Sequence, residues 1–92
     1  MRDDDKVITA LRRTLELVES SETAAYAHDT VEEIAQRLRE AVRALETGEP
    51  VDRSSLGVLF APTGSIQETS IYNAWGDECV TLSRIVDAFL DK

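Results

Sequence analysis

A nucleophile and a neighbouring base are the side chains most able to do chemistry, and this sequence offers one cysteine and one histidine for those roles. Cys79 lies at the expected start of a helix, where the helix dipole would favour a thiolate. Val80 and Leu82 beside it favour a small buried side chain instead. His28 precedes another helix start, which favours a solvent-facing or loop-closing role. The two residues therefore do not indicate a nucleophilic site.

Paired carboxylates are the second kind of catalytic group, because general acid–base catalysis can use two carboxyls at a suitable separation. The candidates are Glu32 with Glu33, Glu68, and Asp77 with Glu78. All of them lie in the expected first turns of helices, where acidic side chains are favoured by capping and by the helix dipole alone. We therefore expect no enzymatic activity.

Metal and phosphate ligands are equally sparse. Asp3, Asp4 and Asp5 are adjacent, but they lack the glycine and glutamate spacing of a calcium loop. One cysteine and one histidine exclude zinc sites built from several such ligands. Gly64 and Ser65 precede an expected helix and could offer amides to an anion, yet no second glycine or lysine completes a phosphate loop. We expect neither a metal nor a cofactor.

The composition is typical of one small globular domain over residues 1–92, with 42% hydrophobic and 30% charged residues. Eighteen acidic against ten basic residues give a net charge of −8. This charge argues against binding to nucleic acid and to anionic membranes, because both need a positive face. Without a long apolar run or a secretory leader, we expect a cytoplasmic protein.

Two long helices are predicted in the first half from apolar residues spaced three to four apart. The first begins in the cluster 3–5 and ends near Ser20. The second begins after Asp29 or Thr30, each of which has a glutamate three residues later as in a capping box, and ends at Gly48. Residues 22–28 form the connection, which the sequence leaves open as helical turn or loop.

The second half is predicted to hold shorter elements and a third long helix. Asp52 can cap a short segment, in which residues 56–60 fit either a helix or a buried strand. Ser65 and Glu68 form a second possible capping box. Asp77 is the expected cap of the last helix. The apolar stripe of that helix would contain Val80, Leu82, Ile85, Val86, Phe89 and Leu90.

These elements predict an all-α fold, namely a small antiparallel bundle of three main helices. One or two short helices would lie in an irregular segment over residues 52–76. Four of the five aromatic residues lie in the C-terminal half, where they would fill the space between this segment and the bundle.

Acidic residues are concentrated around the first connection. Residues 14–36 contain six acids and no lysine or arginine. A solubilising surface would explain them, but such a field also speeds encounter with a basic partner and selects the sign of its charge. Tyr26 lies among them as a possible aromatic anchor. The docking face predicted here contains Glu19, Glu22, Tyr26, Asp29, Glu32 and Glu33.

The residues from Leu59 to Glu68, continued by the run from Trp75 to Glu78, resemble a segment of small acidic helical bacterial proteins. Those proteins are similar to the immunity proteins of secreted-toxin systems. The resemblance implies a protein that binds one basic cognate toxin and occludes its active cleft by shape and charge. It also suggests a second docking face, which contains Thr63, Ser65, Gln67 and Trp75.

Other binding functions stay open on the sequence alone. An acidic helical protein could also be a phage-type anti-defence inhibitor, or a nucleic-acid mimic that covers a DNA- or RNA-binding surface. A helical homo-oligomeric interaction module, in which an exposed apolar stripe pairs with itself, is a further alternative. The sequence therefore predicts a protein partner but does not choose between a monomer and a homodimer.

Overall fold

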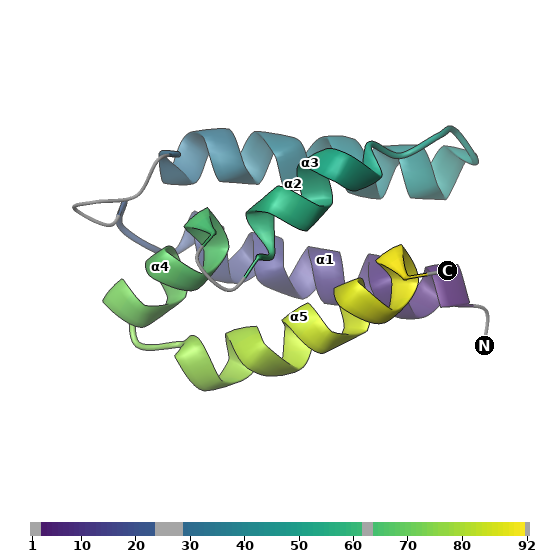
Figure 1. The fold of residues 1–92 in the computed structure, drawn as a ribbon. Coiled ribbons are helices and arrows are strands. Elements are labelled where there is room, and N and C mark those ends of the chain that lie inside the picture. Colours follow the sequence, from purple (N-terminus) through teal and green to yellow (C-terminus); the bar gives the residue numbers. More distant parts are fainter. Residues whose placement is uncertain (1–2, 24–28, 62–63, 92) are drawn as a thin grey trace.

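The computed structural model describes residues 3–23, 29–61 and 64–91 (Figure 1). Within these ranges every regular element is a helix, which confirms the predicted all-α class. None of these helices combines the length and apolar character that a membrane span requires. The five helices are α1 (Asp3–Glu19), α2 (Val31–Thr47), α3 (Arg53–Leu59), α4 (Ser65–Tyr72) and α5 (Gly76–Leu90).

Helix α1, which is as long as α2, packs against both α2 and α5. Figure 1 shows α1 between these two helices and running in the opposite direction to both. The short helix α3 packs against α2 and α5, whereas α4 packs against α5 and also contacts α1 and α2. Residues 56–60, which the sequence left open as helix or strand, are helical as far as Leu59, where α3 ends.

One hydrophobic cluster is formed by buried side chains from all five helices. Because an α-helix turns every 3.6 residues, the buried positions of each long helix recur three or four residues apart. These positions are Val7, Ala10, Leu11, Thr14 and Val18 in α1, Ile34, Ala35, Leu38, Ala41 and Val42 in α2, and Cys79, Leu82, Val86 and Phe89 in α5.

The predicted stripe of the last helix was wrong at two positions, Val80 and Ile85, which are exposed. Each lies next to a buried residue, Cys79 or Val86, and one residue is about 100° around a helix. The core face of α5 therefore includes the cysteine, and Val80 lies on a different face from the one expected.

The start of α2 follows one of the two capping registers that the sequence left open, and its end at Gly48 is as predicted. The Glu33 backbone N–H donates to Thr30 Oγ1 at 3.2 Å, and the Thr30 N–H donates to Glu33 Oε1 at 3.1 Å, which is a complete capping box. Gly48 ends the helix with a φ of 75°, the left-handed conformation that favours glycine. Asp52 caps α3 by accepting from the Ser55 N–H at 3.0 Å, also as predicted.

Two other predicted caps were wrong. Gly64, not Ser65, occupies the cap position of α4, and no side chain caps that end. A Cβ at Gly64 would lie 2.5 Å from the Val58 carbonyl oxygen, so the close turn after α3 requires glycine there. The last helix α5 begins at Gly76 after Trp75, which places Asp77 inside the first turn.

Candidate functional site

Two residues of the second predicted docking face, Ser65 and Trp75, contact the chain that carries the acidic residues of the first. The chain after α1 lies against the C-terminal end of α4 and the turn before α5 (Figure 1). The Glu22 N–H donates to Asn73 Oδ1 at 2.9 Å, and Asn73 Nδ2 donates back to the Glu22 carbonyl at 2.8 Å. We call this region the acidic end, defined by Glu19, Glu22, Asp29, Glu32 and Glu33.

Trp75 and Ser65, both expected in a docking face, lie inside the molecule and hold the acidic end in place. Trp75 is only 9% exposed, and its Nε1 donates to Ser21 Oγ at 2.9 Å. Ser65 is also buried, and its hydroxyl donates to Asp29 Oδ2 at 2.7 Å. These contacts join α4 and the start of α5 to the chain between α1 and α2.

The remaining expected residues are placed differently. Gln67 is partly buried and lines a groove between α4 and α5, and none of the residues of the acidic end lines that groove. Tyr26, His28 and Thr63 lie outside the described residues, as does most of the connection over residues 22–28.

Three of the five acids of the acidic end already have partners within the chain. Arg39 donates to Glu19 at 2.7 Å. Asp29 lies 3.6 Å from Arg37 and accepts the Ser65 hydroxyl. Glu33 belongs to the capping box of α2.

The two arginines were not part of the predicted face. They follow the acid-rich run in sequence, and only the packing of α2 beside α1 brings Arg39 to Glu19. To predict that pair, one would need to know which residues of α1 and α2 face each other.

Glu22 and Glu32 are the acids of this region that stay available. Both are exposed, and neither carboxylate makes an ion pair or hydrogen bond within the described residues. Glu32 continues along the outer face of α2 into Gln36 and Glu40, whose side chains are hydrogen-bonded to each other at 3.1 Å. A partner approaching this face therefore meets negative charge that no described residue neutralises.

Of the carboxylates considered for acid–base chemistry, Glu33 caps α2 and Glu78 forms an ion pair with α1. Arg13 donates to both oxygens of Glu78, at 2.6 and 3.0 Å, which joins α1 to α5. The hydrogen bond from Arg13 lowers the pKa of Glu78 below its usual value, although partial desolvation opposes the shift. The same bond raises the pKa of Arg13. Glu78 thus stays ionised and bound, whereas a general acid needs a raised pKa.

Cys79 is buried as expected, and its sulfur lies 3.8 Å from the Ser83 hydroxyl. No imidazole is described near it, and the only histidine, His28, is outside the described residues. Within the described part of the chain, no group of three or more histidine, cysteine or acidic residues could hold a metal ion.

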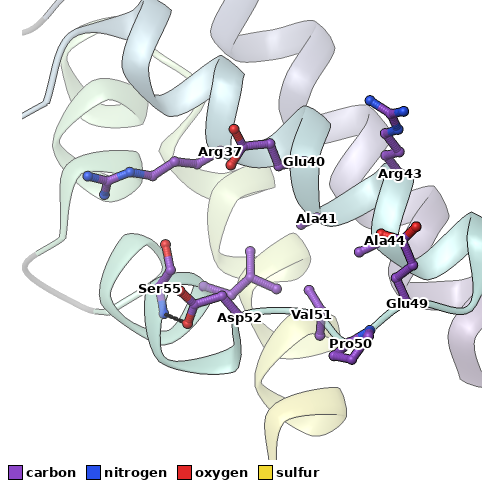
Figure 2. A pocket seen from close by; sticks show the side chains of 11 residues that line it. Arg37, Glu40, Ala41, Arg43, Ala44, Glu49, Pro50, Val51, Asp52 and Ser55 are labelled. Carbon is purple, nitrogen blue, oxygen red and sulfur yellow. Dashed lines mark hydrogen bonds between the residues drawn. The ribbon is translucent and has the colours of Figure 1, made fainter.

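One hollow, of about 400 Å³, lies between α2 and the chain leading into α3 (Figure 2). Figure 2 shows Arg37 and Glu40 on one side, Arg43 and Glu49 on another, and Pro50 between the helices. The charges are mixed, because both basic and acidic side chains line the hollow. Asp52 there is already used as the cap of α3.

A second groove, of about 360 Å³, lies between α4 and α5 and is mainly apolar. Ile71 on α4 and Val80 on α5 form its exposed walls, being 65% and 52% exposed. The buried side chains of Phe60 and Cys79 also line it. We call it the α4–α5 groove.

No protein-family model matches the chain, and no curated protein or solved structure is significantly similar to it. The case for function therefore depends on the surfaces of this molecule, which differ in charge, polarity and internal bonding.

Proposed function

We propose that this chain is a small acidic binding protein that docks on a basic protein partner and carries out no reaction. More specifically, we propose an immunity protein that neutralises a bacterial toxin by covering its active cleft. The observation that carries the proposal is the pair Glu22 and Glu32, two exposed carboxylates that have no ion pair among the described residues and lie on a backbone that the fold holds in place.

The backbone around Glu22 is fixed from three sides, which favours docking without a large loss of entropy. Asn73 makes two hydrogen bonds to the Glu22 backbone, and Trp75 bonds to the preceding Ser21. On the other side, the Val31 N–H donates to Thr23 Oγ1 at 3.1 Å, which joins this chain to the start of α2. A preorganised surface binds more tightly because less conformational freedom is lost.

Electrostatics supports the same function. A net charge of −8 attracts a basic partner at long range, and the exposed carboxylates of the acidic end direct the encounter. The antiparallel bundle of three long helices would serve as the scaffold that keeps this end in one shape. The likeness of residues 59–78 to immunity proteins supports a toxin as the basic partner.

The test begins with affinity capture from native cells and identification of the bound protein by mass spectrometry. Its association rate is then measured with Glu22→Lys/Glu32→Lys and with a control, Glu49→Lys/Asp91→Lys. The control makes the same charge change just after the C-terminal ends of α2 and α5, which Figure 1 shows at the opposite end of the molecule. We expect the association rate to fall about tenfold or more for the first variant and only severalfold for the control.

Two results would contradict this proposal. Equal effects of both double variants would show that net charge matters and the acidic end does not. Unchanged binding at low salt would show that the acidic end takes no part. If the captured protein is a toxin, the parent chain should block its activity, and the Glu22→Lys/Glu32→Lys variant should need a higher concentration to do so.

A further inference from the structure

Within the described part of the chain, no segment covers the α4–α5 groove, although its walls are apolar. Ile71 and Val80 expose more than half of their surface, and both side chains line the same hollow. An exposed apolar side chain beside an apolar hollow can enter the same hollow of a second molecule.

The α5 side of the groove has the pattern of a helix-packing surface. Gly76, Val80, Ser83 and Asp87 line it at spacings of four, three and four residues. This spacing places them along one seam of the helix, as in paired helices. Glycine and serine leave room for a second helix to approach closely.

The charges of the groove distinguish it from the rest of the surface. Arg84 and Asp87 are its only charged lining residues, both are exposed, and neither makes an ion pair within the described residues. The groove lining is therefore neutral in a chain whose net charge is −8. A basic partner gains no attraction here, whereas a second copy meets less repulsion here than at the acidic end.

We propose that the α4–α5 groove is the interface with a second copy of this chain, in a twofold symmetric dimer. In such a dimer the same patch faces itself, so Ile71 and Val80 of each copy enter the groove of the other. Arg84 of each copy pairs with Asp87 of its partner, which gives both charges the ion pair they lack. This inference does not depend on the proposed function, because the acidic end lies outside the interface.

Sedimentation velocity of the purified chain tests the dimer directly. We expect monomer and dimer in a concentration-dependent equilibrium between about 1 and 200 μM, the range of a small interface. Ile71→Glu and Val80→Glu should each weaken the dimer about tenfold or more, because they place charge in an apolar contact.

Val58→Glu is the matched control, because Val58 is equally exposed but lies on α3 outside the groove lining. It should leave the dimer unchanged. Circular dichroism should show full helicity for all three variants, since none of the three side chains is buried. A chain that stays monomeric throughout, or a dimer that is lost only in Val58→Glu, overturns the proposal.

A charge exchange tests the orientation of the two copies. Arg84→Glu and Asp87→Arg should each weaken the dimer severalfold, because each places like charges opposite one another. The double variant R84E/D87R should restore parental dimerisation, because the pairs form again with reversed sign. Failure of the double variant to restore it would overturn the proposed pairing. An open polymer would also contradict the proposal, since a twofold interface closes at two copies.

Discussion

The acidic end and the α4–α5 groove lie close together in the fold but differ in the polarity and charge of their side chains. The acidic end is polar, negatively charged and held by hydrogen bonds from Asn73 and Trp75. The groove is apolar, its lining is neutral, and its exposed walls, Ile71 and Val80, have no covering segment among the described residues. Two surfaces of one small chain thus differ in charge and in polarity.

Trp75 lies at the boundary between the two regions. Its indole nitrogen is bonded to Ser21 beside the acidic end, and the next residue, Gly76, lines the groove. The backbone around Trp75 therefore supports both surfaces, although their side chains differ in charge and polarity. Changes to this backbone should affect both surfaces, and changes to one surface should spare the other.

The largest expected effect comes from the shared core. Leu38 on α2 is fully buried, so Leu38→Ala leaves a cavity and should reduce the free energy of unfolding by about 2–5 kcal/mol. Urea unfolding followed by circular dichroism measures this loss. Leu38→Met keeps most of the volume and should cost less than about 1.5 kcal/mol. A cost for the alanine variant below about 0.5 kcal/mol, the range of surface sites, would contradict the packing of α2.

The second-largest effect is expected from Asn73→Ala, which should change the acidic end but not the α4–α5 groove. Asn73→Ala removes the acceptor of the Glu22 N–H and the donor to its carbonyl, which should cost about 1–2 kcal/mol. Amide hydrogen exchange at Glu22 should quicken about tenfold, since 1.4 kcal/mol corresponds to a factor of ten. Binding of a basic partner should weaken while dimerisation through the groove stays unchanged.

Gln36→Ala provides the control for the asparagine, because it removes an exposed amide whose one bond among the described residues is to Glu40. Its effect on stability should stay within about 0.5 kcal/mol. If Asn73→Ala leaves exchange at Glu22 unchanged, then the hydrogen bonds to Asn73 do not hold the acidic end.

Sequence alone predicted those features of the fold that are set within a few residues of the chain. The stop at Gly48 depends on local backbone groups, so its residue type was sufficient, and the same local groups narrowed the capping box to Asp29 or Thr30, of which Thr30 with Glu33 is the one formed. The cap of α4 failed because the close approach of Gly64 to the Val58 carbonyl decides it, and that contact is not visible in the local pattern.

The candidate site was predictable only in part for the same reason. The run of acids is plain in the sequence, and Glu22 and Glu32 are exposed as a docking face requires. The Arg39–Glu19 pair and the bond from Ser65 to Asp29 join residues 20 and 36 positions apart. Such contacts follow from helix packing, so their partners could not be predicted from spacing.

Salt should change the two surfaces in opposite directions, with effects of about tenfold or less. Raising the ionic strength from about 0.05 to 0.5 M shortens the screening length severalfold. Association of a basic partner with the acidic end should slow, because its attraction is screened. Dimerisation through the groove should strengthen, because two copies that each carry −8 repel one another less.

Parallel measurements on one preparation, by association kinetics and by sedimentation, make this comparison. Salt effects of the same sign on both would show that the two surfaces do not differ in the way proposed. The groove variant Val80→Glu should bind the basic partner like the parent chain, which keeps the two measurements independent.

The smallest expected effect concerns the ion pair that joins α5, one wall of the groove, to α1. Because Arg13 lowers the pKa of Glu78 in the folded state, the pair stabilises the fold at pH values above the unfolded pKa, near 4.3. This contribution is lost as the pH falls through the lowered pKa. Thermal unfolding between about pH 3 and 7 should therefore show a weaker acid dependence for Glu78→Gln than for the parent chain.

Asp77→Asn is the matched control, because it removes a carboxylate from the same first turn of α5 without touching Arg13. Its effect through the helix dipole should resemble that of Glu78→Gln, so the difference between the two variants isolates the ion pair. Both partners are substantially exposed, which keeps that difference small and reduces it further in salt. Identical acid dependence in the two variants would mean that the pair positions α5 without stabilising the fold, and that the groove wall is held by core packing alone.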